Sequence, residues 1–153
     1  MEARREPGYG PMVPVTEGEW TGWSQWGRDP FEALTGPYYC RYEGGRRART
    51  ALRAEERHMN GGGFMHGGAL MTFADYTLFF VVRDELADIP AVTATLNAEF
   101  VGSVTAGDLV EGTGEIVKAG RSMIFVRGML SVADAPVVSF SAVVKRSGGA
   151  RQG

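Results

Sequence analysis

The distribution of apolar and polar positions along the chain singles out one segment, residues 69–82. It is apolar at nearly every position and contains a single carboxylate, Asp75. A helix that is apolar on almost all of its faces must be covered on most sides by other elements. The pattern therefore predicts a buried central helix, with the rest of the chain folded around it.

A short helix and two strands are predicted before the central helix. Asp29 and Pro30 are residue types preferred at the N-cap and first position of a helix, which we expect to end at Gly36. Residues 38–42 and about 46–57 then have the composition of the two strands of a hairpin, joined by a glycine-containing turn.

Four antiparallel strands are predicted after the central helix. Between residues 92 and 100 the even positions are apolar and the odd positions polar, so we expect the two sets on opposite faces. Further strands are expected over 109–118, 121–132 and 137–146. One sheet layer on one helix suits a chain of this length, so the predicted fold class is α+β, with a curved antiparallel sheet wrapped around a long central helix.

The first 27 residues form an N-terminal extension, and we expect residues 1–15 to be mobile or draped on the surface. Thr16 and Glu19 have the spacing of a capping box, which predicts a short helix. Three tryptophans at three-residue intervals would share one side of it: Trp20, Trp23 and Trp26. We expect a flap that packs its tryptophans on the core; a lid over a substrate channel is the alternative.

Length, composition and charge limit the number of domains and the kinds of partner that we expect. With 153 residues, 44% hydrophobic and 22% charged, the chain is typical of one globular domain. We place this domain at residues 28–147, between the Trp-rich extension 1–27 and a disordered tail at 148–153. A net charge of −2 does not supply the basic face that nucleic acid requires, so no nucleic-acid partner is expected.

Cysteine usage and hydropathy indicate the compartment. Cys40 is the only cysteine and cannot form an intrachain disulfide, which is typical of a reducing environment. The N-terminus lacks the apolar core of a signal peptide. The central helix is short for a bilayer and is interrupted by Asp75. We therefore expect a soluble cytoplasmic protein with no membrane partner.

Asp75 is the residue that points to chemistry. An isolated buried carboxylate is costly, so it is expected to be hydrogen-bonded or to line a polar cavity. In a purely structural role, Asp75 would bond to a sheet hydroxyl such as Thr93 or Thr95 and fix the helix to the sheet. Its spacing alone leaves the structural and chemical roles open.

The glycine-rich loop before the helix favours chemistry. Gly67 and Gly68 stand where the helix begins, so their N–H groups lack intrahelical acceptors and suit an oxyanion or a polarised carbonyl. No Gly-Lys-Ser/Thr follows, which disfavours a phosphate-binding loop. His58 and His66 are eight residues apart with no cysteine near them, which disfavours a metal site.

These motifs follow one another in the order His58-x-Asn60, a run of glycines, His66-Gly67-Gly68 and then Asp75. The combination resembles the hotdog-fold acyl-CoA thioesterases, specifically their PaaI-like branch, over roughly residues 30–146. The resemblance implies hydrolysis of an acyl-CoA or aryl-CoA thioester to free acid and coenzyme A. It implies no cofactor, because coenzyme A enters as part of the substrate.

The same resemblance implies a role for each matching residue. Asp75 would act as general base or nucleophile, the Gly67 N–H would polarise the thioester carbonyl, and Asn60 would position the carbonyl or the attacking water. Thr93 matches a hydroxyl that assists the water in some members. His66 is included among the catalytic-site residues, but we expect its role to be structural, with its ring hydrogen-bonded to the backbone near the loop.

The substrate-binding side is expected to include Gly68, Tyr76 and exposed cations. Lys118, Arg121 and Lys145 stand at strand ends, where they could bind the phosphates of coenzyme A; solvated turn charges are the alternative. The bulky Tyr76 and the Trp-rich extension depart from the family pattern and leave the acyl group open.

The helix geometry predicts a shared site. Gly67 and Asp75 are eight residues apart, or ~12 Å along a helix that rises 1.5 Å per residue. A scissile carbonyl must lie ~3 Å from both the oxyanion donor and the attacking group. We therefore expect Asn60 and Gly67 of one subunit to meet Asp75 and Thr93 of another in an obligate homodimer, which can assemble further into a homotetramer.

Two other functions are compatible with this motif. A non-catalytic module on the same fold would bind or sense acyl-CoA without turnover. A hydratase of related fold would use an aspartate and a histidine close together in the sequence, whereas His66 precedes Asp75 by nine residues.

Overall fold

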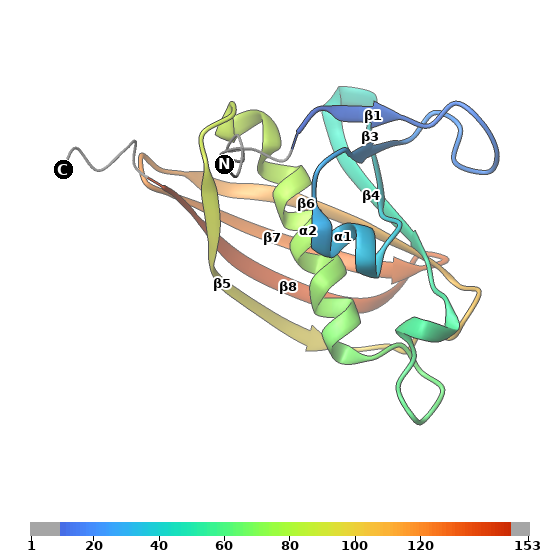
Figure 1. Cartoon of the computed structure of the whole chain (residues 1–153). Helices are drawn as coiled ribbons and strands as arrows, with labels where there is room; N and C mark the ends of the chain where they lie inside the picture. The colour runs from blue at the N-terminus through green and yellow to red at the C-terminus, as the bar shows by residue number, and fades with distance from the viewer. Residues whose placement is uncertain (1–9, 148–153) are drawn as a thin grey trace, which may run out of the picture.

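The computed structural model describes residues 10–147, which form one eight-stranded antiparallel sheet curved around a long helix (Figure 1). The strands are β1 (Met12–Pro14), β2 (Ser24–Trp26), β3 (Tyr39–Glu43), β4 (Arg47–Arg53), β5 (Ala91–Phe100), β6 (Leu109–Ala119), β7 (Met123–Val132) and β8 (Ala135–Arg146). Their order in the sheet is β1-β2-β3-β4-β6-β7-β8-β5. The predicted α+β class and wrapped helix are confirmed; the predicted tail at 148–153 lies outside the described residues.

The central helix is α2 (Gly67–Leu86), which is longer at both ends than the apolar run that predicted it. At its C-terminal end the polar residues Arg83, Asp84 and Glu85 remain helical, and the helix stops where Ala87 adopts a left-handed conformation with φ 46°. A hydrophobic pattern detects only the buried part of a helix, so it missed this last turn. Within residues 10–147 no helix is long and apolar enough to cross a membrane.

The core lies between α2 and the concave face of the sheet. Phe73, Leu78 and Phe80 of α2 are almost completely buried, as are Leu130 and Val138 of the sheet. Burying one such side chain contributes roughly 1.5–3 kcal/mol relative to leaving it exposed. The central helix is therefore held on the sheet mainly by apolar packing.

The hairpin and short helix before α2 follow the prediction with one difference. Helix α1 (Pro30–Thr35) is capped by Asp29, whose Oδ1 accepts hydrogen bonds from the N–H groups of Phe31 and Glu32, each at 3.0 Å. Two 3-10 turns, η1 (Gly44–Arg46) and η2 (Glu56–His58), flank the second hairpin strand. The prediction that this strand continues to residue 57 is therefore wrong, because the chain turns after β4.

The expected helix around Thr16 and Glu19 is not formed. Residues 15–23 make turns between β1 and β2, with Gly18 at φ 78° and Gly22 at φ 89°, values that a right-handed helix excludes. The side chain of Glu19 instead pairs with Arg53. The extension thus continues the sheet, with Ser24 of β2 opposite Cys40 of β3.

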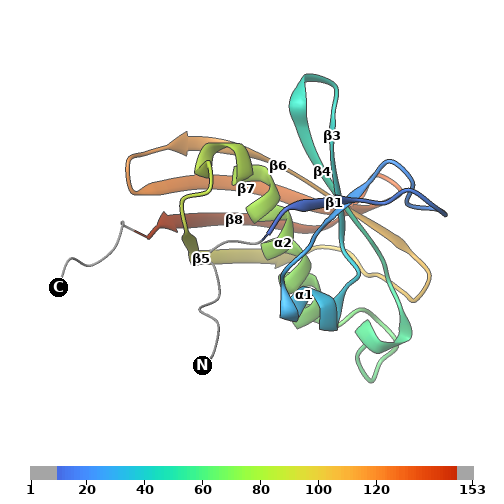
Figure 2. The ribbon, with the colours of Figure 1, turned by 45° about the horizontal axis from the view of Figure 1, so that its top comes forward.

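The tryptophans of the extension nevertheless pack on the body of the protein, as a flap would. Trp26 makes edge-to-face contacts with Tyr76 and Phe80 of α2, at centroid distances of 5.2 and 6.0 Å. Trp20 stacks on Tyr39 at 4.0 Å, and Trp23 is buried. Figures 1 and 2 both show α1 beside α2.

A β-bulge between Thr93 and Thr95 interrupts the alternation predicted for β5. Before the bulge, Thr93 faces α2 and Val92 is exposed; beyond it, Leu96 and Ala98 pack on the core. The prediction that Val92 and Leu96 share a face is therefore wrong, because one inserted residue reverses the alternation. The bulge turns Thr93 toward the helix.

A buried pair of hydroxyls joins α2 to β4. Thr77 donates to the carbonyl of Phe73 at 2.9 Å, so its oxygen accepts the hydrogen bond from Thr50 at 2.7 Å. Gly112 makes this contact possible, because a Cβ there would overlap both hydroxyl groups.

We predict that Thr77→Val lowers the free energy of unfolding by about 1–3 kcal/mol, because it leaves the Thr50 hydroxyl buried without an acceptor. The double variant Thr50→Val/Thr77→Val should lose less than Thr77→Val alone, since no polar group is then stranded. Urea unfolding measures both. A double variant that loses the sum of the two single effects would contradict this account.

Candidate active site

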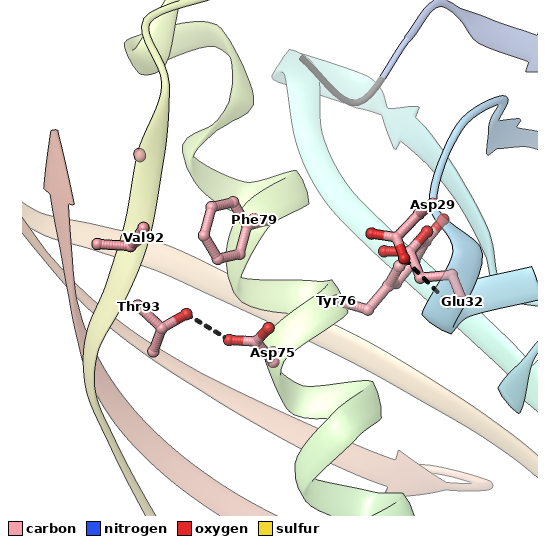
Figure 3. Close-up of a pocket in the computed structure, with 8 residues that line it drawn as sticks. Asp29, Glu32, Asp75, Tyr76, Phe79, Val92 and Thr93 are labelled. Atoms are coloured by element: carbon pink, nitrogen blue, oxygen red, sulfur yellow. Dashed lines mark hydrogen bonds between the residues drawn. The ribbon is translucent and has the colours of Figure 1, made fainter. Parts of the chain in front are cut away.

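A cavity of about 280 Å³ opens between α1, α2 and the start of β5 (Figure 3). It is lined by Asp29, Glu32, Asp75, Tyr76, Phe79, Ala91, Val92 and Thr93. The cavity therefore contains Asp75, the carboxylate in the middle of α2, together with two carboxyl groups that precede it in the chain.

Asp75 makes the predicted bond to a sheet hydroxyl and also lines the cavity. Its Oδ1 accepts a hydrogen bond from the Thr93 hydroxyl at 2.6 Å (Figure 3). Thr95, the other candidate, lies beyond the bulge and is exposed. No residue of the range 10–147 donates a hydrogen bond to Oδ2 of Asp75, so one oxygen fixes the helix to β5 and the other is available to a reactant.

Burial raises the pKa of Asp75 above the usual range of an aspartate, the hydrogen bond from Thr93 lowers it, and the nearby Asp29 charge raises it. Desolvation disfavours the charged form of a carboxyl group, whereas a donated hydrogen bond stabilises that form. Burial also raises the pKa of Glu32 to about 8, with the charges of Asp29 and Asp75 acting in the same direction. Two carboxyl groups in this cavity thus have altered acidity.

The loop before α2 is closed by Asn60. Its Oδ1 accepts from the N–H groups of Gly62 and Phe64 at 2.9 and 3.2 Å, and its own N–H donates to the Phe64 carbonyl at 2.7 Å. The neck of the loop is held by His66 N–H, which donates to the carbonyl of His58 at 2.8 Å. In a single chain, therefore, the oxygen of the Asn60 side chain organises the loop.

His66 is the N-cap of α2 and leaves the first N–H group of the helix unpaired. Its Nδ1 accepts from the N–H of Gly68 at 2.8 Å, which agrees with the expectation that this ring bonds the backbone near the loop. Within the described part of the chain, no acceptor takes the N–H of Gly67. Gly67 is thus an available backbone donor at the positive end of the helix.

His58 is buried and structural. Its Nδ1 accepts from Glu55 N–H at 3.0 Å, and its Nε2 donates to the carbonyl of Thr35 at 2.6 Å. Among residues 10–147, no group of three or more His, Cys, Asp or Glu side chains is arranged so that it could hold a metal ion.

The three predicted phosphate-binding cations lie together at one end of the sheet. Lys118 and Arg121 belong to the β6–β7 hairpin, and Lys145 is opposite both Met123 of β7 and Val92 of β5. All three cations are exposed. Since Val92 lines the cavity, this end of the sheet adjoins it.

The structure divides the predicted site residues into two groups. Asp75, Thr93 and Tyr76 line the cavity, whereas Asn60 and the cap formed by residues 66–68 lie at the other end of the helix segment, about two turns away. Sequence reasoning missed Asp29 and Glu32 as cavity residues. Asp29 was recognised only as a helix cap, and no local signal places either residue beside Asp75.

The chain matches known proteins in sequence and in structure. The family model described as "Thioesterase superfamily" matches residues 62–138. The protein described as "Putative esterase PA0474", from Pseudomonas aeruginosa, is 36% identical over 115 residues, which cover 74% of this chain and 86% of the relative.

Two solved structures show the shared fold. The E. coli PaaI protein of the phenylacetic acid degradation operon superposes with a TM-score of 0.70 at 18% identity, covering 80% of this chain and 87% of that protein. A hypothetical thioesterase from Streptococcus pneumoniae, solved with coenzyme A, gives 0.68 at 20% identity, covering 77% and 93%. The expected hotdog fold is therefore confirmed.

We predict that Thr93→Val raises the pKa of Asp75, because it removes the hydrogen bond that stabilises the carboxylate. A ¹³C NMR titration of the aspartate carboxyl carbons measures this directly. Thr95→Val is the matched control and should leave the Asp75 titration in place. An unchanged titration in Thr93→Val would contradict the described hydrogen bond.

Proposed function

The chain belongs to the thioesterase superfamily, and from this membership we propose that it hydrolyses an acyl-CoA or aryl-CoA thioester to the free acid and coenzyme A. The observation that carries the proposal is Asp75, which is held by Thr93 through one oxygen and presents the other to a cavity. A carboxylate with a raised pKa is suited to accept a proton.

In the proposed reaction, Asp75 takes a proton from water while the water oxygen bonds to the thioester carbonyl carbon. The carbonyl π electrons move to its oxygen, and their return breaks the C–S bond and expels the thiolate, which is then protonated. Direct attack by Asp75, giving a mixed anhydride that water hydrolyses, uses the same group as nucleophile. Both routes form a negatively charged carbonyl oxygen that requires a donor.

The proposed donor for this oxygen is the N–H of Gly67. It is unpaired among the described residues and stands at the positive end of α2. His66 supports the role by consuming the neighbouring Gly68 donor and fixing the first turn. Losing one such donor typically costs ~10²–10³ in rate.

A homodimer would bring the two groups together, and strand β5 supports this proposal. It is the last strand of the sheet and pairs only with β8 within the described chain, so its outer edge is free to bind another strand. Thr93 bonds to Asp75 near one end of β5, and the ring of Phe100 lies against Gly67 at the other end.

The register of such a dimer follows from these two contacts. If β5 pairs antiparallel with its copy about a two-fold axis at Asn97, Thr95 of one strand faces Glu99 of the other, and the bulge at Ala94 brings Thr93 opposite Phe100. The partner's Gly67 then approaches Asp75, completing the site that one chain lacks. Asn60 would enter with the partner's loop.

Coenzyme A recognition is the remaining part of the proposal. The cations Lys118, Arg121 and Lys145 gather beside the Val92 end of the cavity, where they would bind phosphate groups. The Streptococcus pneumoniae neighbour with bound coenzyme A supports a carrier of this kind. No cofactor beyond the substrate's own coenzyme A is proposed.

We predict that the protein releases coenzyme A from at least one member of a panel of short, medium, long-chain and aryl acyl-CoAs. Asp75→Asn should lower kcat/KM by at least about a hundredfold, because the amide can neither accept the proton nor attack. Thiol release is followed with a chromogenic thiol reagent. Saturable binding without release would identify a non-catalytic module, and an Asp75→Asn variant as fast as wild type would refute the mechanism.

We predict that Gly67→Pro is as impaired as Asp75→Asn, whereas Gly67→Ala keeps substantial activity. Proline removes the N–H but is tolerated at the first position of a helix, and His66 at φ −60° and ψ 137° is compatible with a following proline. The Cβ of alanine would have only ordinary contacts with Phe100, at 3.7 Å.

The same variants test the shared site. Refolding an equal mixture of Gly67→Pro and Asp75→Asn should restore about a quarter of the native rate, because half the dimers then hold one intact site of two. A site contained within one chain would give no restoration on mixing.

A further inference from the structure

Helix α1 holds two carboxyl groups in the cavity although none of its residues is buried. Its N-terminal end is closed by the Asp29 cap. Its C-terminal end is tied to η2, where Arg57 donates to the carbonyl of Leu34 at 2.5 Å and His58 donates to that of Thr35 at 2.6 Å. The helix is thus positioned by polar contacts at both ends, which direct Asp29 and Glu32 toward α2 (Figure 3).

The carboxyl groups of this cavity are poorly compensated. No lysine, arginine or histidine is among the eight residues that line it. Within residues 10–147, the Glu32 carboxyl has neither a hydrogen bond nor an ion pair. Carboxylates that share a cavity repel one another, so each disfavours the ionisation of its neighbours.

The groups that face Glu32 come from four segments: Asp29 before its own helix, Asp75 and Tyr76 on α2, Tyr38 and Cys40 at β3, and Arg57 on η2. The guanidinium of Arg57 is engaged elsewhere, because its Nε donates to Glu55 at 2.7 Å and its Nη1 to Leu34. Asp29 and Asp75 are therefore the dominant charges around Glu32, and Asp29 is the charge that acts on Asp75.

We propose, building on the hydrolysis proposed above, that α1 sets the strength of Asp75 as a base. In this proposal Asp29 and Glu32 are positioning residues that act on Asp75 through their charges and do not touch the substrate. Each negative neighbour makes the Asp75 carboxylate hold a proton more tightly. General-base rates rise with the basicity of the group that takes the proton.

The acidity of Glu32 indicates that Asp29 and Glu32 act on Asp75 in different pH ranges. Its pKa is raised to about 8, chiefly by burial and then by Asp29 and Asp75, so at neutral pH it holds a proton. Besides burial, the charge of Asp29 then raises the pKa of Asp75. Above about pH 8, Glu32 ionises and adds a second negative charge beside Asp75.

The sign of the effect follows from the direction in which charge moves. In the proposed step, negative charge leaves Asp75 and develops on the carbonyl oxygen at Gly67, on the far side of the scissile carbon. Negative neighbours of Asp75 therefore destabilise the starting state more than the transition state. Ionisation of Glu32 is expected to accelerate hydrolysis.

The test is kcat/KM against pH, corrected for spontaneous hydrolysis, in wild type, Glu32→Gln and Asp29→Asn. Glutamine resembles the protonated glutamate, and asparagine preserves the helix cap. Wild type should show a rise of roughly threefold through pH 8, which Glu32→Gln lacks. Asp29→Asn should move the acid limb, which reports Asp75, to lower pH.

The control is Glu56→Gln, an exposed carboxyl on η2 outside the cavity, which should retain the wild-type profile. Glu32→Lys extends the charge series and should slow hydrolysis. An alkaline rise that persists in Glu32→Gln, or an acid limb unmoved in Asp29→Asn, would overturn the proposal.

A ¹³C titration of Asp75 in the same variants separates this proposal from the proposed function. The Asp75 pKa should fall in Asp29→Asn whether or not a thioester is hydrolysed. A wild-type protein that cleaves no acyl-CoA but shows this fall would refute the hydrolysis alone. An active protein in which the Asp75 pKa does not move would refute the role of α1 alone.

Discussion

Partial burial of the Asp75 carboxylate beside the apolar core is the constraint on which this structure depends. Asp75 sits on a helix whose neighbouring side chains pack into the core, and Thr93 supplies the only side-chain hydrogen bond that it receives from the described residues. That bond needs Thr93 to face the helix, which in turn needs the bulge in β5. A local irregularity of the sheet thereby serves the chemistry of the helix.

The N-terminus of α2 carries the complementary feature. His66 closes the first turn by accepting from Gly68, and Asn60 closes the loop by accepting from two backbone N–H groups. Both side chains accept hydrogen bonds from nearby backbone N–H groups, and the N–H of Gly67 has no acceptor among the described residues. A loop held by its own hydrogen bonds, with an open N–H donor at the positive end of a helix, is an arrangement that suits a developing oxyanion.

Helix α1 links the N-terminal part of the chain to this chemistry. It contributes no buried side chain, so its place is explained by its caps and by the bonds from Arg57 and His58 rather than by the core. The tryptophan-rich extension also reaches this region, because Trp26 contacts Tyr76, a residue that lines the cavity. Segments without a large share of the core can still define the environment of a functional group.

The sequence alone determined the features that depend on local rules. The apolar run predicted the buried helix, the Asp29-Pro30 pair predicted α1, and the Asn60…Gly67…Asp75 spacing predicted two half-sites on one helix. These predictions rely on periodicity, capping and helix rise, which a few neighbouring residues specify. Thr93 was predicted too, as one of two candidate hydroxyls.

Only the tertiary structure decided between Thr93 and Thr95, because a bulge reverses the alternation without a clear signal in the residues themselves. It also brought Asp29 and Glu32 beside Asp75, a meeting of segments far apart in the chain. Likewise, the positive φ angles of Gly18 and Gly22 belong to turns between β1 and β2, where a helix was expected. In each case the outcome depends on long-range packing, which no window of local sequence contains.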